Sequence, residues 1–116
     1  MLVFVYGSLK RGHVLHHLLE SQPCHGHATT KPFYRLFDLG SYPGLVEWPE
    51  GLAIQGEVYR IDAECLRRLD EAEGVAEGHY ARRSVSLEAP FDIHNVQAWF
   101  WLHPVSGRRD CGQCWP

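Results

Sequence analysis

The first residues with chemical potential form a small-residue loop near the start of the chain, in the stretch FVYGSLKRG. Gly7 and Gly12 have the spacing of a phosphate-binding G-x-x-x-x-G loop, but the residues that follow are not the Lys and Ser or Thr that such a loop needs. A nucleophilic Ser8 is also disfavoured, because Gly7-Ser8 does not make a G-x-S-x-G motif. Two interpretations stay open: a plain turn, or a nest of backbone N–H groups for a carboxylate or a developing oxyanion.

The second candidate is the carboxylate of Glu73. The segment from Asp62 to Glu73 is expected to be helical, with Asp62 as its N-cap and Gly74 as its stop. At about 100° per residue, Leu66 and Leu69 mark the inward face and Glu73 projects between them. Burial there would raise the pKa of Glu73 and suit a base that works near neutrality. In the alternative interpretation, the helix has frayed by residue 73 and Glu73 points into water.

The elements that position these groups are expected to be mostly strands. Segments rich in β-branched and aromatic residues predict strands at 2–6, 33–39, 54–61, 80–87 and 96–102, the first of them central in its sheet. Val14–Glu20 is expected to be a short helix, SYPGLV a turn, and 104–116 an irregular tail. This order indicates an α+β fold, with a mixed, curved or closed β-barrel of about five to seven strands and two short helices.

Size and charge narrow the function classes. With 116 residues the chain fits one domain, residues 1–116. Its formal net charge of -3 argues against general binding to nucleic acid or anionic membranes. No apolar run of about 18 residues is present to span a membrane, and the start lacks the basic region of a signal peptide. We therefore expect a cytoplasmic protein whose four cysteines are thiols.

The loop and the helix end together resemble a known family. FVYGSLKRG, and LDEAEG at Leu69 to Gly74 followed by Tyr80 and Arg82, resemble the γ-glutamylcyclotransferase superfamily. The resemblance is closest to its small single-domain branch, the γ-glutamylamine cyclotransferases and AIG2-like proteins. SYPGLV and IQGEVYRID lie between the two segments in the order of that branch. The resemblance covers residues 2–86 and leaves the tail outside.

The resemblance implies a mixed β-barrel with a pocket between the first loop and the second helix. It implies that Glu73 is the general base, and that the substrate is bound by Tyr6, Gly7, Ser8 and Leu9, with Tyr80 as a pocket wall. The implied reaction cyclises a γ-glutamyl amine or γ-glutamyl amino acid to 5-oxoproline and releases the amine. Because the substrate carries its own nucleophile, no metal or other cofactor is expected. Whether the loop backbone binds the α-carboxylate or the oxyanion stays open, as do the leaving amine and the oligomeric state.

Rival interpretations are a non-catalytic protein that binds a small carboxylate or amino acid in the same pocket, and another acyl chemistry such as removal of a γ-glutamyl protecting group. His13, His16 and His17 have helix-like spacing, but a solvated helix face is favoured over a metal site, which would need further ligands. Cys111 and Cys114 form one C-x-x-C pair, for which a loose tail is favoured over metal or redox chemistry.

Overall fold

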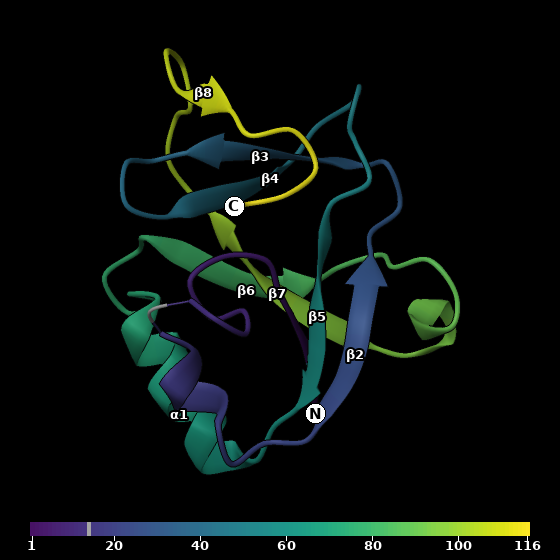
Figure 1. The fold of residues 1–116 in the computed structure, drawn as a ribbon. Helices are drawn as coiled ribbons and strands as arrows, with labels where there is room; N and C mark the ends of the chain where they lie inside the picture. Colours follow the sequence, from purple (N-terminus) through teal and green to yellow (C-terminus); the bar gives the residue numbers. More distant parts are fainter. Residues whose placement is uncertain (14) are drawn as a thin grey trace.

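The computed structural model describes residues 1–13 and 15–116, and its strands form two sheets (Figure 1). The larger sheet has five strands in the order β2-β5-β1-β7-β6, and the smaller has three in the order β4-β3-β8. The strands are β1 (Leu2–Val5), β2 (Cys24–Thr29), β3 (Tyr34–Asp38), β4 (Pro43–Glu47), β5 (Gln55–Arg60), β6 (Tyr80–Ser84), β7 (Val96–Trp101) and β8 (Arg109–Asp110). The helices are α1 (Ala63–Ala72) and two 3-10 helices, η1 (His16–Leu19) and η2 (Phe91–Ile93).

The centre of the larger sheet is buried on both faces. Side chains alternate along β1, so that Phe4 packs into a core shared with the smaller sheet, while Val3 and Val5 pack into a core under α1 and η1. Burial on both sides explains why β1 reads as a continuous apolar run rather than as alternating apolar and polar residues. β1 is the central strand, pairing antiparallel with β5 and parallel with β7.

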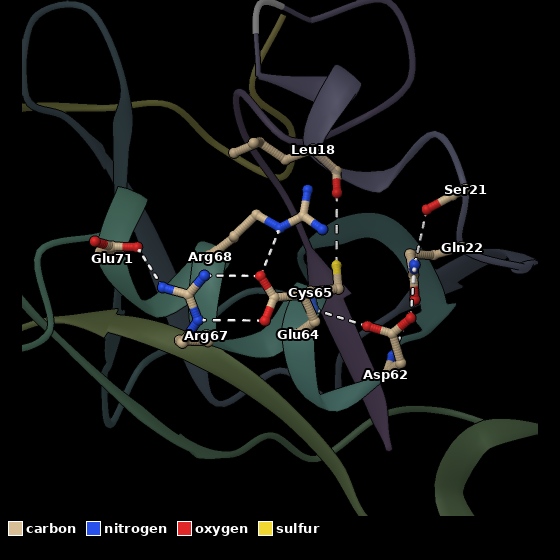
Figure 2. Close-up of polar contacts among 9 residues, drawn as sticks. All are labelled: Leu18, Ser21, Gln22, Asp62, Glu64, Cys65, Arg67, Arg68 and Glu71. Atoms are coloured by element: carbon tan, nitrogen blue, oxygen red, sulfur yellow. Dashed lines mark hydrogen bonds and ion pairs between the residues drawn. The ribbon is translucent and has the colours of Figure 1, made fainter.

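The start of α1 is fixed by side-chain hydrogen bonds (Figure 2). Asp62 caps the helix by accepting from the Cys65 amide at 2.8 Å, as its position before the helix predicted. The Cys65 thiol donates to the Leu18 carbonyl at 3.5 Å, so the helix is also tied to η1. On the exposed side, Arg67 pairs with Glu64 at 2.7 Å and with Glu71 at 3.2 Å. α1 therefore presents one charged face to solvent and an apolar face to the sheet.

Glu73 is the C-cap residue of α1, and its amide is still part of the helical hydrogen-bond pattern. The Glu73 amide donates to the Leu69 carbonyl at 2.9 Å, so the helix has not frayed at this residue. Gly74 follows with a φ of +66°, its amide donates to the Glu71 carbonyl at 3.1 Å, and the amide of Val75 donates to the Asp70 carbonyl at 3.0 Å. These bonds form a Schellman motif, which needs a residue in the left-handed region at the position that Gly74 occupies.

The five expected strands are present, and the closed barrel is wrong. The edge strands β2 and β6 approach each other only just beyond their ends, where Thr30 and Leu87 form a single bridge. Pro32 and Pro90 follow within a few residues and have no amide to extend the ladder. The result is a curved, open five-stranded sheet (Figure 1). The smaller sheet covers the face opposite to α1 and η1.

Other expectations also need correction. SYPGLV, expected as a turn, supplies most of β4, because proline is compatible with the first position of a strand. The tail expected to be irregular contributes β8, which pairs with β3. β2 was missed because its sequence, CHGHAT, shows no apolar alternation. The helix expected from Val14 to Glu20 is the 3-10 helix η1, and Val14 itself lies outside the described residues.

No helix in the described part of the chain has the length and hydrophobicity needed to cross a bilayer.

Candidate active site

A cavity of about 530 Å³ opens where the loop after β1, the end of α1 and the starts of β4 and β6 meet. All the residues that the sequence analysis assigned to the site line it, namely Tyr6, Gly7, Ser8, Leu9, Glu73 and Tyr80. The fold therefore brings together two segments that lie more than sixty residues apart in the chain. A cavity of this size matches those that hold small molecules in proteins.

The loop after β1 presents backbone donors that have no partner among the described residues. Its carbonyls are engaged: Gly7 accepts from the Lys10 amide at 3.0 Å, and Ser8 from the Leu15 amide at 2.8 Å. The Leu9 carbonyl contacts Nδ1 of His16 at 3.1 Å. Within residues 1–13 and 15–116, the amides of the same three loop residues donate to no protein acceptor. The loop is thus a turn whose carbonyls hold its shape and whose N–H groups stay available to an anionic ligand.

Glycine at position 7 is required by close packing. A Cβ atom there would lie 2.6 Å from Cγ and 2.8 Å from Cδ of Pro43, the first residue of β4. Real Cβ atoms do not approach other carbons so closely, so any side chain would push the loop away from β4. The absence of a side chain lets the backbone form part of the cavity surface next to β4.

Glu73 lies half-buried in this cavity. Burial raises the pKa of its carboxyl to about 7, and the negative charge of Asp70 adds to the rise. A carboxyl with this pKa exchanges a proton readily near neutral pH, which is the property needed of a general acid–base group.

Two tyrosines flank the carboxyl and stay protonated. The Tyr6 hydroxyl donates to the Trp99 carbonyl, and the Tyr80 hydroxyl donates to the Pro43 carbonyl at 2.7 Å. Burial raises the pKa of both phenols well above their ordinary value, and the charge of Glu73 contributes to each rise. They are therefore neutral walls whose hydroxyl protons are already committed to backbone carbonyls.

Sequence reasoning missed several lining residues. They come from three segments that carry no catalytic signature: Ser41, Tyr42 and Pro43 before and in β4, Glu77 and His79 before β6, and Trp99 in β7. SYPGLV lies between the two family-like segments in the order that the family shows. That position in the sequence was the one feature that could have placed it at the site. Trp99 could not have been found, because a tryptophan in a strand is typical of a core.

The other candidate ligands lie elsewhere. Lys10 turns away to the tail, where its ammonium donates to the Trp115 carbonyl at 2.7 Å. The tail is anchored rather than loose, since the Cys111 amide donates to the Leu36 carbonyl at 2.7 Å. All four cysteines are free thiols. Among the described residues, no three His, Cys, Asp or Glu side chains are placed to hold a metal ion.

Glu57, the other acid that could be considered as a base, lines a separate cavity of about 340 Å³. Its carboxylate accepts from the Tyr59 hydroxyl at 3.0 Å and from the Arg11 amide at 2.9 Å. Glu57 is thus occupied in a structural role outside the main cavity, and Glu73 is the better candidate.

The comparisons with known proteins agree with this geometry. The family model described as gamma-glutamyl cyclotransferase, AIG2-like, matches residues 3–115, and so extends over the tail that the sequence resemblance left outside. A provisionally named gamma-glutamylcyclotransferase of Vibrio cholerae is 39% identical over 92% of this chain and 85% of its own length. The solution structure of YtfP from Escherichia coli superposes with a TM-score of 0.71 at 33% identity, covering 97% of this chain and 93% of that one. An AIG2-like protein from Mus musculus superposes with a TM-score of 0.70 at 28% identity, covering 88% and 76%. The chain therefore belongs to the gamma-glutamyl cyclotransferase, AIG2-like family.

Proposed function

We propose that the protein cyclises γ-glutamyl amines to 5-oxoproline and releases the free amine, with Glu73 as the proton-transfer group. The observation that carries this proposal is the cavity that joins a carboxyl of pKa about 7 to a loop whose amides have no acceptor within residues 1–13 and 15–116. Membership of the family and the names of its relatives support the same reaction class.

The reaction needs little beyond what these residues supply. Glu73 in its carboxylate form takes a proton from the α-ammonium of the substrate, and the α-nitrogen attacks the γ-carbonyl carbon to close a five-membered ring. The tetrahedral oxyanion collapses, the bond to the leaving nitrogen breaks, and the two protons given up by the α-nitrogen end on the released amine, relayed by Glu73. Holding the chain folded for attack removes most of the entropic barrier.

The amides of Gly7, Ser8 and Leu9 serve as the anion site of this reaction. They can bind the substrate α-carboxylate, which fixes the α-nitrogen near Glu73, or they can stabilise the oxyanion. Either role depends on the approach of the Gly7 backbone to Pro43, since that contact places the loop along the cavity.

The charge of the lining favours one class of leaving amine. Its carboxylates come from Glu71, Glu73 and Glu77, and no Lys or Arg of the described chain lines the cavity. A γ-glutamyl amino acid carries an additional carboxylate on its leaving group, and that carboxylate would find no Lys or Arg partner among the described lining residues. We therefore infer that amines without a carboxylate are the preferred leaving groups.

The direct test is product release from a panel of γ-glutamyl compounds, followed by mass spectrometry of 5-oxoproline and of the free amine. Stoichiometric release of both products at catalytic enzyme concentration supports the proposal. Binding of 5-oxoproline or of γ-glutamyl compounds without turnover of any of them would identify a binding protein instead. Release of glutamate rather than 5-oxoproline would indicate hydrolysis of the γ-glutamyl bond.

A further inference from the structure

Asp70 stands out because it is a half-buried acid on the sheet side of α1 that the proposed reaction does not use. Its Oδ1 accepts from the indole N–H of Trp99 at 2.8 Å and from Nε of Arg82 at 3.1 Å, and its Oδ2 accepts from Nη2 of Arg82 at 3.3 Å. The Arg82 and Asp70 side chains are each only about a quarter exposed. Partly buried, bidentate pairs of this kind fix geometry more firmly than exposed ion pairs do.

The partners of Asp70 are placed by the sheet. Arg82 on β6 and Trp99 on β7 are directly opposite in the antiparallel register, so their side chains share one face. The remaining Arg82 donor Nη1 is taken by the side chain of Gln97, two residues before Trp99 on the same face. One carboxylate on α1 therefore ties the helix to both strands at once.

Asp70 also precedes Glu73 by three residues, and side chains with this spacing are neighbours on a helix surface. Its own carbonyl accepts the Val75 amide in the motif that ends α1. On the other side, the carbonyl of Trp99 accepts the hydroxyl of Tyr6, a residue of the cavity wall. Asp70 is thus linked through Trp99 to Tyr6, which lines the same cavity as Glu73.

We propose that Asp70 is a positioning residue for Glu73: held by Trp99 and Arg82, its carboxylate fixes the last turn of α1 against β6 and β7 and so places the Glu73 carboxyl in the cavity. The inference rests on the proposed function for its catalytic meaning, but the placement of the carboxyl is a property of the folded protein alone.

The charge of Asp70 has a consequence for how Glu73 titrates. Burial is the larger cause of the raised Glu73 pKa, and the Asp70 charge is the second. Arg82 compensates part of that charge, so the two side chains should act on Glu73 in opposite directions. The other titratable groups that line the cavity around Glu73 are Tyr6 after β1, Tyr42 before β4, His79 before β6, Tyr80 from β6, Glu71 from α1 and Glu77 after it.

The test compares three substitutions by two readouts: NMR titration of the Glu73 side-chain carboxyl, and the pH profile of kcat/KM for 5-oxoproline release. Asp70→Asn keeps an acceptor for Trp99 and removes the charge, so the Glu73 midpoint should move to lower pH. Arg82→Gln leaves Asp70 uncompensated, so the midpoint should move to higher pH. Trp99→Phe keeps the ring and the charges but removes the indole donor, so the rate on the pH-independent plateau should fall by about tenfold or more with little change in midpoint.

Glu64→Gln is the matched control, because Glu64 lies on the exposed face of α1 and pairs with Arg67 away from the cavity. It should change neither readout. A purely structural role for Asp70 predicts lower activity in Asp70→Asn and Arg82→Gln with the Glu73 midpoint unmoved, and that result would overturn the proposal. The NMR titration needs no substrate, so opposite shifts in a protein that turns over nothing would contradict the proposed function while supporting the role of Asp70.

Discussion

Glu73 should destabilise the folded protein at neutral and alkaline pH, and the size of the effect follows from its pKa. Burial raises that pKa from an ordinary value of 4.5 to about 7. Each pKa unit corresponds to about 1.4 kcal/mol, so keeping Glu73 ionised costs the folded state about 3 kcal/mol relative to the unfolded chain. The pKa of Glu73 is higher in the folded state than in the unfolded chain, so the folded state binds the proton more tightly. This contribution to stability is complete below about pH 4.5 and is lost as the pH rises through about 7.

Glu73→Gln removes this titration while keeping the shape of the side chain. We compare the free energy of unfolding of the variant with that of the parent at each pH. The variant should gain about 3 kcal/mol of stability relative to the parent between about pH 4.5 and about pH 8.5. Urea unfolding followed by circular dichroism at several pH values measures it. Subtracting the parent at each pH cancels the contributions of all other groups.

Glu64→Gln is the control, with a slope of opposite sign. Hydrogen bonding to Arg67 lowers the pKa of Glu64, so its carboxylate helps the fold at neutral pH, weakly because it is exposed. A stability difference for Glu73→Gln that stays constant with pH would show that Glu73 titrates as an ordinary exposed carboxyl, and the reasoning from burial would fail.

The other predictions concern activity. In the parent, kcat/KM for 5-oxoproline release should rise with pH through a midpoint near 7 as Glu73 ionises, and a flat profile from about pH 6 to about pH 8 would remove Glu73 as the base. Gly7→Ala places a Cβ 2.6 Å from Pro43, so kcat/KM should fall by about tenfold or more while thermal melting shows a folded protein, and parent-level kinetics would show that the loop need not approach β4. In a matched series, γ-glutamyl butylamide should be turned over several-fold faster than γ-glutamyl 4-aminobutyrate, because an added carboxylate near the lining residues Glu71 and Glu77 costs on the order of 1 kcal/mol. Equal rates would contradict this preference. Activity should survive exhaustive dialysis against EDTA, and loss of turnover that zinc restores would assign a metal to the reaction.

Local sequence patterns were sufficient to predict the elements whose formation depends on near neighbours in the chain. The Asp62 cap, the Gly74 stop and the position of Glu73 on the Leu66 and Leu69 stripe predicted α1 to within a residue or two, because capping and amphipathic spacing depend on near neighbours. β1 was predicted as central because only a strand buried on both faces carries such an apolar run.

Features that depend on tertiary contacts could not be predicted from the sequence. Half of the β2 residues are exposed, and the segment becomes a strand because β5 pairs with it. The cavity wall formed by Pro43 and Tyr42 depends on how the smaller sheet packs, and the anchoring of Asp70 depends on Arg82 and Trp99 being opposite each other in the register of β6 and β7. Such contacts join residues far apart in the chain, and no local spacing encodes them.

The measurement that tests the central claim most directly is 5-oxoproline release by Glu73→Gln, with ligand binding measured on the same sample. The amide keeps size and hydrogen bonding but cannot take the ammonium proton, so turnover should fall by about 10²–10⁴-fold. 5-Oxoproline should still bind to the folded variant, because the loop amides are unchanged. A folded Glu73→Gln protein that releases 5-oxoproline at the parent rate would contradict the assignment of Glu73 as the proton-transfer group.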